Sequence, residues 1–204
     1  MPARNVVKED ILESYYHIYA RGVNRSSIFN HDKDYVVFMS LLKRYLSTEV
    51  ATNENGIVYP HLYGQVELLA FCLLSNHFHL LIYQQEEGAM QQLMRAVMTS
   101  YSMYFNKTYR RSGPLFESRY RASHIDSDRY LTHISRYIHL NPDKWQTYKY
   151  SSIPFYTDNY SAEWLRPEKI FGLFSSKYEY LEFLADYEDY KATLEDTKRE
   201  LANN

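Results

Sequence analysis

The sequence predicts an α+β fold built on a four-stranded antiparallel sheet, and two observations lead to it. Four short segments alternate apolar with polar residues or are apolar throughout, which is typical of strands. Two longer segments repeat apolar residues at steps of three and four, which is typical of helices that pack on a sheet. The order strand, helix, strand, strand, helix, strand is that of the ferredoxin-like (split βαβ) arrangement with two packing helices.

The first half of this arrangement begins with a strand over residues 15–23, where apolar and polar residues alternate. Residues 32–46 follow as a helix with its apolar residues on one stripe. After the turn-rich residues 53–56, an apolar hairpin is predicted to pair residues 65–74 with residues 77–83.

The second half begins with a helix over residues 88–107, which the Ser-Gly-Pro sequence at 112–114 breaks off. Residues 115–125 form the fourth predicted strand. An added C-terminal helix of about four turns follows, with Asp126 or Ser127 as its N-cap.

Pro142 ends the added helix. Three polar side chains lie four residues apart on it: His133, Tyr137 and Asn141. Residues at this spacing share one helix face and rise by about 6 Å per step. A phenol therefore lies between an imidazole and an amide on that face.

His77 and His79 lie in the second strand of the hairpin with one residue between them. Alternate side chains of a strand point to one face, so the two imidazoles project together, about 7 Å apart at their roots, and can converge on one metal ion. In the predicted fold this strand is central and its histidines face the added helix. A short motif of this kind counts only in context, which other parts of the chain supply.

Three sequence blocks supply that context: NHFHLLI, SYSMYFNKTYRRSGPLFESRYRA and YLTHISRYIHLNP. In this order and spacing, over about residues 15–157, they resemble the single-tyrosine HUH transposases (IS200-like), in the branch that includes the REP-associated tyrosine transposases. In that family two histidines and a polar side chain hold a divalent metal, and a helix tyrosine is the nucleophile. The resemblance implies that His77, His79 and Asn141 are the metal ligands and Tyr137 the nucleophile, although some members have glutamine where Asn141 stands.

The chemistry of these residue types agrees with the implied roles. A tyrosine hydroxyl has a pKa of about 10, so it is a poor nucleophile at neutral pH and needs a Lewis acid to polarise the phosphate. Two imidazoles and an amide leave coordination positions open, which favours Mg²⁺ or Mn²⁺ over zinc in a closed site. Tyr130, two turns before Tyr137, is the alternative nucleophile, and His133 is not expected to be catalytic.

Residues 95–121 contain many basic residues and a single acidic one, although the chain has a net charge of −2. Aromatic residues are interleaved among them, a mixture typical of surfaces that bind single-stranded nucleic acid, although a solvated helix face backed by core aromatics would look the same. Arg119 and Arg121 are two apart on the predicted strand and would face the same side. The predicted DNA-binding residues are Arg95, Lys107, Arg110, Arg111, Arg119 and Arg121.

Acidic residues outnumber basic ones in the last part of the chain, where Ser176 and Glu179 form a predicted capping box at the start of a helical tail. We predict an HUH single-tyrosine transposase domain over residues 1–157 and an acidic helical appendage over residues 158–204. The appendage is expected to pack against the domain, and competition with DNA for the basic stretch is the alternative.

The single cysteine, Cys72, excludes an intrachain disulfide and predicts a reducing, cytoplasmic location. No apolar run approaches the ~18 residues of a membrane span, and the N-terminus lacks the apolar region of a signal peptide. We expect a protein without a membrane partner that acts as a monomer or homodimer.

The resemblance implies a metal-dependent transposase or endonuclease that cleaves and rejoins single-stranded DNA at hairpin-flanked sites through a 5′-phosphotyrosine intermediate. Two alternatives stay open. One is a domesticated relative that holds a DNA or RNA hairpin without cutting it, and the other is a replication-initiator or relaxase-like HUH nuclease. The C-terminal position of Tyr137 and the RSGPLF block favour the transposase branch.

Overall fold

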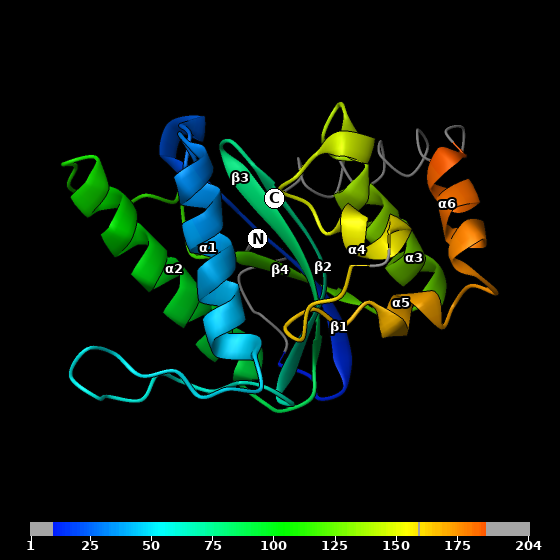
Figure 1. Cartoon of the computed structure of the whole chain (residues 1–204), viewed down its shortest axis with the longest axis horizontal. Coiled ribbons are helices and arrows are strands. Elements are labelled where there is room, and N and C mark those ends of the chain that lie inside the picture. Colours follow the sequence, from blue (N-terminus) through cyan, green and yellow to red (C-terminus); the bar gives the residue numbers. More distant parts are fainter. Residues whose placement is uncertain (1–9, 159, 187–204) are drawn as a thin grey trace, which may run out of the picture.

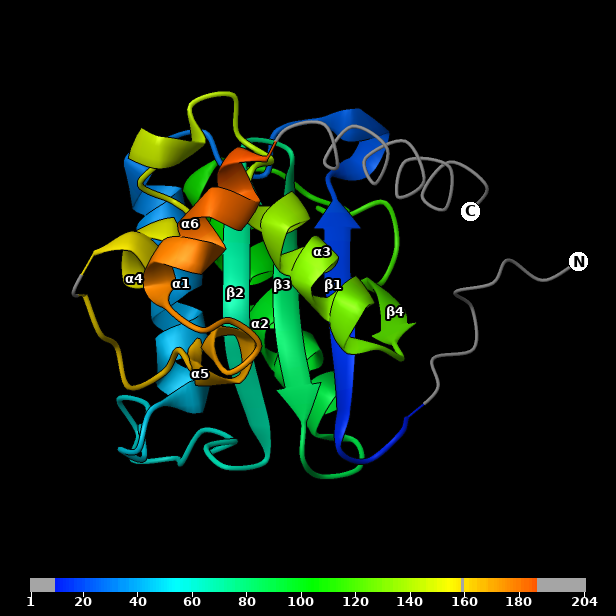
Figure 2. The same ribbon diagram turned by 90° about the vertical axis from the view of Figure 1, so that its right-hand side faces the viewer.

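The computed structural model describes residues 10–158 and 160–186. At its centre is an antiparallel sheet in the order β2-β3-β1-β4, so β1 and β3 are the inner strands (Figure 2). The predicted split βαβ arrangement is therefore confirmed. The strands are β1 (Ser14–Arg21), β2 (Val66–Leu74), β3 (His77–Gln84) and β4 (Arg121–Ile125).

Helices cover both faces of the sheet (Figure 1). The first face carries α1 (Asp32–Leu46) and α2 (Ala89–Thr108). The second face carries α3 (Asp128–His139), α4 (Ile153–Thr157), α5 (Glu168–Phe171) and α6 (Lys177–Ala185). Two single 3₁₀ turns, η1 (Val23–Arg25) and η2 (Trp145–Thr147), lie in connecting segments.

Alternation along the strands produces two separate cores. Ile18 and Leu80 are buried under α1 and α2, whereas Leu81 belongs to the core on the α3 side. In β2 the register shifts between Leu68 and Ala70, and this bulge turns both Leu69 and Ala70 toward the α3 side. Each face of the sheet therefore has its own packed layer.

A buried carboxylate fixes the beginning of α1. Asp34 accepts hydrogen bonds from the backbone N–H groups of Asn30 and His31 at 2.8 and 3.0 Å. It also accepts from the hydroxyls of Tyr104 and Tyr109 at 2.9 and 2.7 Å. Burial raises the pKa of Asp34, but these hydrogen bonds outweigh it and hold the pKa below its ordinary value. One carboxylate thus ties α1 to the end of α2.

The fourth strand is shorter than predicted, because it begins at Arg121 instead of Leu115. Its ladder with β1 starts at the pair of Tyr19 with Arg121. Further along, an isolated bridge pairs Gly22 with Phe116, so the second segment has two more residues than β1 between these pairings. The extra residues bulge out, and this bulge ends the strand.

The added helix is also shorter than predicted. It ends at His139 with Leu140 as its C-cap, so Asn141 lies just beyond it. Pro142 is the physical reason, since a proline disfavours the helical conformation of the residue before it. At the other end Ser127 is the N-cap residue, one of the two that were predicted.

Helix α6 packs against α3. The Tyr180 hydroxyl shares a hydrogen bond of 2.6 Å with His139 Nδ1, and Arg136 Nη1 donates to the Phe183 carbonyl at 3.1 Å. Ser176 Oγ accepts from the Glu179 N–H at 3.1 Å, which is one half of the predicted capping box, whereas the Glu179 carboxylate accepts from the backbone N–H of Ser175 instead of Ser176. The predicted boundary after residue 157 stays a prediction, and residues 187–204 of the predicted appendage lie outside the described residues.

Candidate active site

The predicted histidine pair lies on the α3 side of the central strand β3. The ring centroids of His77 and His79 are 5.0 Å apart. His79 is 2% exposed and His77 is half-buried. Across the strand pair, Arg21 lies opposite His77 and Tyr19 lies opposite His79. The two imidazoles are therefore held on rigid backbone beside the added helix.

The orientation of the His77 ring is set by its neighbour in the hairpin turn. Asn76 Nδ2 donates to the Arg25 carbonyl at 3.2 Å, which directs Asn76 Oδ1 toward His77 Nδ1 at 2.6 Å. Since a carbonyl oxygen only accepts, His77 Nδ1 carries the proton. His77 Nε2 is then left with its lone pair, which is the form that ligates a metal.

His79 shares a buried hydrogen bond with His17 of β1. His17 Nε2 lies 2.9 Å from His79 Nδ1, and the two rings are stacked with centroids 5.1 Å apart. Burial lowers the pKa of His17 to about 3 and that of His79 well below its ordinary value, so both rings are neutral near pH 7. His79 Nε2 is buried and has no hydrogen-bond partner among residues 10–158 and 160–186.

Tyr137 comes from α3 and places its ring edge-on against these histidines. Its ring centroid is 5.2 Å from that of His79 and 5.9 Å from that of His17. Burial raises the pKa of Tyr137, while a hydrogen bond with the Asn141 side chain and the positive charge of Arg21 work in the opposite direction. The phenol is therefore neutral at pH 7 and already has two groups that stabilise its anion.

Arg21 is an exposed cation at the open side of this cluster. It lies opposite His77 in the register, and after burial its charge is the second cause that lowers the pKa of His77, to about 4. Neither Arg21 nor His17 was predicted from the sequence. Their signal is the alternation of His17, Tyr19 and Arg21 along one strand, the same spacing that singled out His77 and His79.

The other polar residues of α3 lie elsewhere. His133 Nδ1 is 2.9 Å from Arg136 Nη2, and the His133 ring lies against Phe183 of α6. His133 therefore faces α6. Tyr130, the alternative nucleophile, is partly buried against the core on the α3 side.

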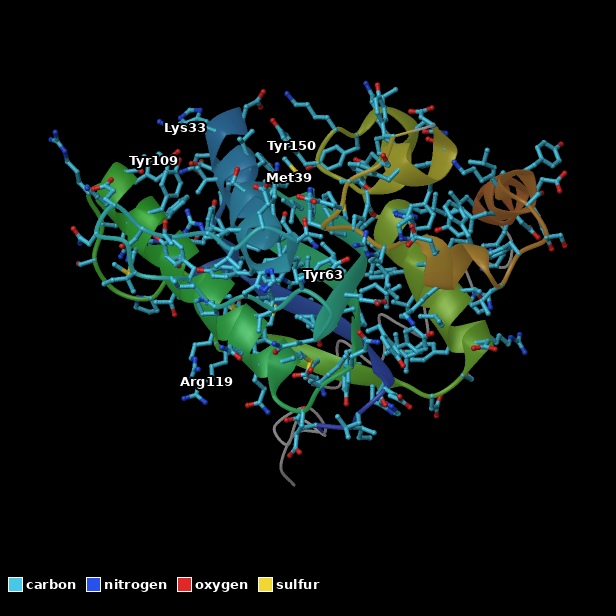
Figure 3. All side chains as sticks on the ribbon, turned by 60° about the horizontal axis from the view of Figure 1, so that its bottom comes forward. Lys33, Met39, Tyr63, Tyr109, Arg119 and Tyr150 are labelled. Atoms are coloured by element: carbon cyan, nitrogen blue, oxygen red, sulfur yellow. The ribbon has the colours of Figure 1, made fainter. Side chains whose placement is uncertain are left out.

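The predicted DNA-binding residues divide into two sets. Arg95, Arg119 and Arg121 line one open groove between α2 and residues 113–121. Arg119 lies before the strand, not in it, which contradicts the prediction that it shares a strand face with Arg121; its side chain projects outward near α2 (Figure 3).

Lys107, Arg110 and Arg111 lie at the C-terminal end of α2 and just beyond it. Lys107 and Arg110 are exposed. Arg111 donates to the Pro114 carbonyl at 3.4 Å, and its guanidinium is 5.7 Å from the centre of the Phe105 ring. The structure therefore divides the six predicted residues into two sets. The arginines of the preceding paragraph line the groove, whereas Lys107, Arg110 and Arg111 lie at the C-terminal end of α2.

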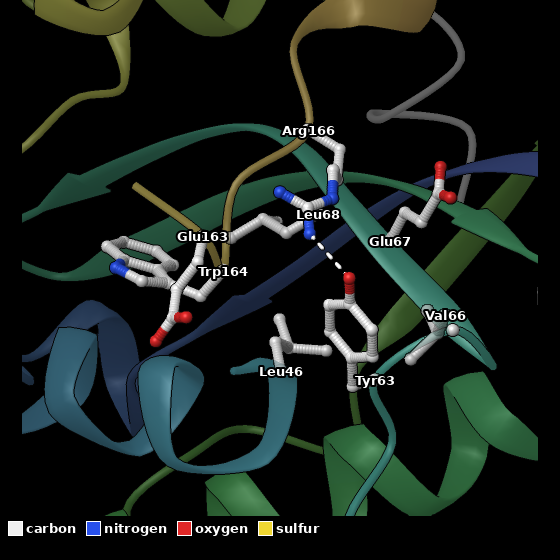
Figure 4. Close-up of a pocket in the computed structure, with 9 residues that line it drawn as sticks. Leu46, Tyr63, Val66, Glu67, Leu68, Glu163, Trp164 and Arg166 are labelled. Atoms are coloured by element: carbon white, nitrogen blue, oxygen red, sulfur yellow. Dashed lines mark hydrogen bonds between the residues drawn. The ribbon is translucent and has the colours of Figure 1, made fainter. Parts of the chain in front are cut away.

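A second, smaller cavity of about 100 Å³ lies at the β2 edge of the sheet (Figure 4). Residues of the end of α1, of β2 and of the segment 163–166 line it, and Arg166 donates to the Tyr63 hydroxyl at 3.1 Å across it. It lies at the opposite edge from β4, where the basic groove runs. The lining of this cavity shows where the segment 163–166, which follows α4, packs against the edge of the sheet.

The donors available to a metal are imidazoles and an amide. In the part of the chain that the structure describes, no three His, Cys, Asp or Glu side chains are grouped so as to hold a metal ion. The two Nε2 atoms of His77 and His79 fit a divalent cation, because that of His79 is buried without a partner among the described residues and that of His77 has a free lone pair. Within the same residues, no helix is both long and apolar enough to cross a membrane.

A split βαβ sheet whose central histidine pair faces a helix tyrosine is the arrangement expected of the single-tyrosine HUH class. The model of the family described as IS200-like transposases matches residues 10–141. The match covers well over half of the chain, so this protein belongs to the IS200-like transposase family. The family predicted from the three sequence blocks is thereby confirmed.

Two other comparisons add less. No curated protein matches the chain in sequence. A solved structure of a REP-associated tyrosine transposase bound to a REP hairpin is 15% identical, with a TM-score of 0.47 over 72% of this chain and 80% of that chain. A likeness at this level carries no conclusion about function.

Proposed function

We propose that this protein is a metal-dependent transposase that cleaves and rejoins single-stranded DNA, with Tyr137 as its nucleophile, and that it lies in the branch of the REP-associated enzymes. The observation that carries the proposal is the packing of the Tyr137 ring against His79, with 5.2 Å between the ring centroids. A strand and a helix both hold the site, which suits chemistry that needs fixed geometry.

In this proposal His77 Nε2, His79 Nε2 and the Asn141 amide hold Mg²⁺ or Mn²⁺. The ion, when bound, would polarise the phosphate of the scissile linkage. Two histidines that remain neutral near pH 7 are available as ligands without losing a proton first. Mn²⁺ accepts imidazole more readily than Mg²⁺ does, so it is the better probe ion.

The step at Tyr137 is a transesterification. Its hydroxyl oxygen attacks phosphorus, the bond from phosphorus to the 3′-oxygen breaks, and the phenol proton is lost as the 3′-oxygen gains one. The products are a 5′-phosphotyrosine and a free 3′-hydroxyl. Because one phosphoester bond is broken and one is formed, a 3′-hydroxyl can reverse the step without an outside energy source. The hydrogen bond with Asn141 and the charge of Arg21 would stabilise the phenolate as it forms.

Single-stranded DNA bearing a hairpin is the proposed partner. Arg121 connects the two surfaces that such a strand would touch, because it lines the groove beside α2 and lies opposite Tyr19, next to the histidines, in the strand register. Arg95 and Arg119 extend the basic surface along the groove. Cations spaced along a groove are suited to a phosphate backbone.

The test is a denaturing gel of the protein incubated with Mn²⁺ and a library of labelled single-stranded DNA hairpins. We expect a covalent band of reduced mobility that disappears when a chelator is present. A native-gel shift without any covalent band would instead support the non-cleaving hairpin binder. Cleavage of strands that carry no hairpin would favour a replication-initiator or relaxase-like nuclease.

A further inference from the structure

His17 is a buried histidine for which the proposed reaction has no direct use. It is 2% exposed and lies on β1, one strand away from the histidine pair. Its Nε2 is 2.9 Å from His79 Nδ1, and the ring planes are inclined by only 18°. The Tyr137 ring meets it edge-on. His17 thus contacts both a proposed ligand and the proposed nucleophile.

A hydrogen bond between two neutral imidazoles contains one proton, so only two arrangements exist. In the first, His79 Nδ1–H donates to His17 Nε2, and His79 Nε2 has a lone pair. In the second, His17 Nε2–H donates to His79 Nδ1, and His79 Nε2 carries a hydrogen. That hydrogen would be buried without an acceptor, since His79 Nε2 has no partner in the described ranges 10–158 and 160–186. The first arrangement is favoured because it leaves no buried N–H of His79 without an acceptor.

At His77, too, a hydrogen-bond acceptor fixes which ring nitrogen carries the proton. Asn76 Oδ1 accepts from His77 Nδ1 and leaves His77 Nε2 as a lone pair. Asn76 does this from the hairpin turn, whereas His17 would do it from the neighbouring strand inside the core. Both imidazoles would then present the same nitrogen, Nε2, to one ion.

We propose that His17 is a positioning residue: by accepting the Nδ1 proton of His79 it fixes the tautomer whose Nε2 is free to bind a divalent cation. This inference rests on the proposed function, since it takes His79 as a metal ligand. Groups that accept the second proton of a ligating histidine fix the ring and raise its affinity for the metal, and their loss weakens binding by roughly 10- to 100-fold.

The first experiment observes the tautomer directly in the metal-free, full-length protein. Long-range ¹H–¹⁵N correlation spectra at pH 7.5 distinguish an imidazole that is protonated on Nδ1 from one that is protonated on Nε2. We expect His79 in the Nδ1–H form and His17 with an unprotonated Nε2. Finding His79 in the Nε2–H form would overturn the inference, whatever the protein does to DNA.

The second experiment measures Mn²⁺ binding without DNA, from the electron paramagnetic resonance signal of the free ion. His17→Gln keeps an acceptor oxygen near the position of Nε2, whereas His17→Leu removes it. We expect the leucine variant to bind Mn²⁺ roughly 10- to 100-fold more weakly and the glutamine variant to stay within about 3-fold of the wild type. Equal affinity in the wild type and the leucine variant would contradict the inference.

Failure of the proposed function has a different signature. If no covalent adduct forms with any DNA but His79 is the Nδ1–H tautomer and His17→Leu weakens Mn²⁺ binding, the role of His17 stands and the reaction does not. If an adduct forms while His17→Leu binds Mn²⁺ normally, the reaction stands and the role of His17 fails. Circular dichroism of both variants separates these results from loss of the fold.

Discussion

The two faces of the sheet each contain a buried polar cluster, and the clusters differ in how completely they are satisfied. On the α1 and α2 face, Asp34 accepts hydrogen bonds from two backbone N–H groups and two tyrosine hydroxyls. On the α3 face, His79 Nε2 and the Tyr19 hydroxyl are buried without partners among the residues that the structure describes.

The difference separates stability from chemistry. A buried group whose hydrogen bonds are all formed fixes the packing around it. Its removal leaves each of its hydrogen-bond donors buried without an acceptor. A buried polar atom without a hydrogen-bond partner destabilises the fold but remains able to bind a ligand such as a metal ion. The Asp34 cluster is of the first kind and the histidine cluster of the second, so substitutions in them should affect different properties.

The largest expected effect is complete loss of the covalent adduct in Tyr137→Phe. Only a hydroxyl is removed, so the unfolding free energy should change by less than about 1 kcal/mol and the DNA affinity should be retained. Tyr130→Phe is the matched control on the same helix and should keep wild-type adduct formation. A gel in which the Tyr130 variant is inactive and the Tyr137 variant active would reverse the assignment.

A second loss of activity is expected in His77→Ala and in His79→Ala, measured as Mn²⁺-dependent cleavage of the hairpin DNA. Each variant removes one imidazole of the proposed metal site, and adding zinc should not restore the activity. Full activity in the presence of a chelator, or in the double alanine variant, would exclude the proposed metal site.

The opposite face should respond in stability instead. Asp34→Ala strands four donors and should reduce the unfolding free energy by about 3 kcal/mol, measured by urea denaturation. Asp32→Ala is the matched control two residues earlier, because the Asp32 carboxylate is exposed, interacts with Lys149 and Tyr150 at the surface, and should change stability by less than about 1 kcal/mol. Equal effects in the two variants would show that the Asp34 cluster has no special role in stability.

The two clusters should also lose stability in different pH ranges. Burial lowers the pKa of His17 to about 3 and that of His77 to about 4, so below their ordinary value of 6.5 the unfolded chain binds protons that the folded protein does not, and stability falls as the pH decreases. The pKa of Asp34 lies below its ordinary 3.8, so its contribution is present above that value and is lost as the pH falls through the folded pKa.

Urea midpoints of the wild type and of Asp34→Asn at several pH values between about 7 and 3 would separate these ranges. We expect parallel curves from pH 7 to about 4.5 and a shallower decline for the asparagine variant below about pH 4. Curves that remain parallel down to pH 3 would mean that the carboxylate contributes nothing through ionisation.

The smallest expected effect concerns DNA affinity. Arg119→Ala together with Arg121→Ala should flatten the slope of log affinity against log salt by up to about 1.4, since each phosphate contact with single strands contributes about 0.7. Lys33→Ala with Lys43→Ala, two exposed lysines of α1, is the matched control and should leave the slope unchanged. No change in the arginine variant would place the DNA path away from the groove.

Several features followed from the sequence because they depend on local pattern. The helix at Asp32–Leu46 and the turn at Ser75 and Asn76 are where apolar periodicity and turn residues placed them. The proximity of the histidine pair to Tyr137 was reached through the split βαβ topology. Only the resemblance to a family assigned chemistry to these residues, and the individual roles stay predictions.

The remaining features depend on pairing across the sheet, which spacing along the chain does not reveal. His17 became relevant only when the register placed β1 beside β3. Arg119 lies outside its predicted strand because two extra residues form a bulge before Arg121. The alternation of residues 115–125 in the sequence does not reveal this bulge. Asn141 lies beyond the helix because Pro142 disfavours the helical conformation of the residue before it, and the helix ends at His139, two residues before the position that the periodicity suggested.

The central claim is that the tyrosine beside the histidine pair becomes joined to DNA. Protease digestion of the Mn²⁺-dependent adduct, followed by mass spectrometry of the peptide that carries the nucleotide, tests it most directly. We predict a 5′-phosphate linked to the side chain of Tyr137 and to no other residue. A nucleotide on Tyr130 or on any other side chain would contradict this account of the site.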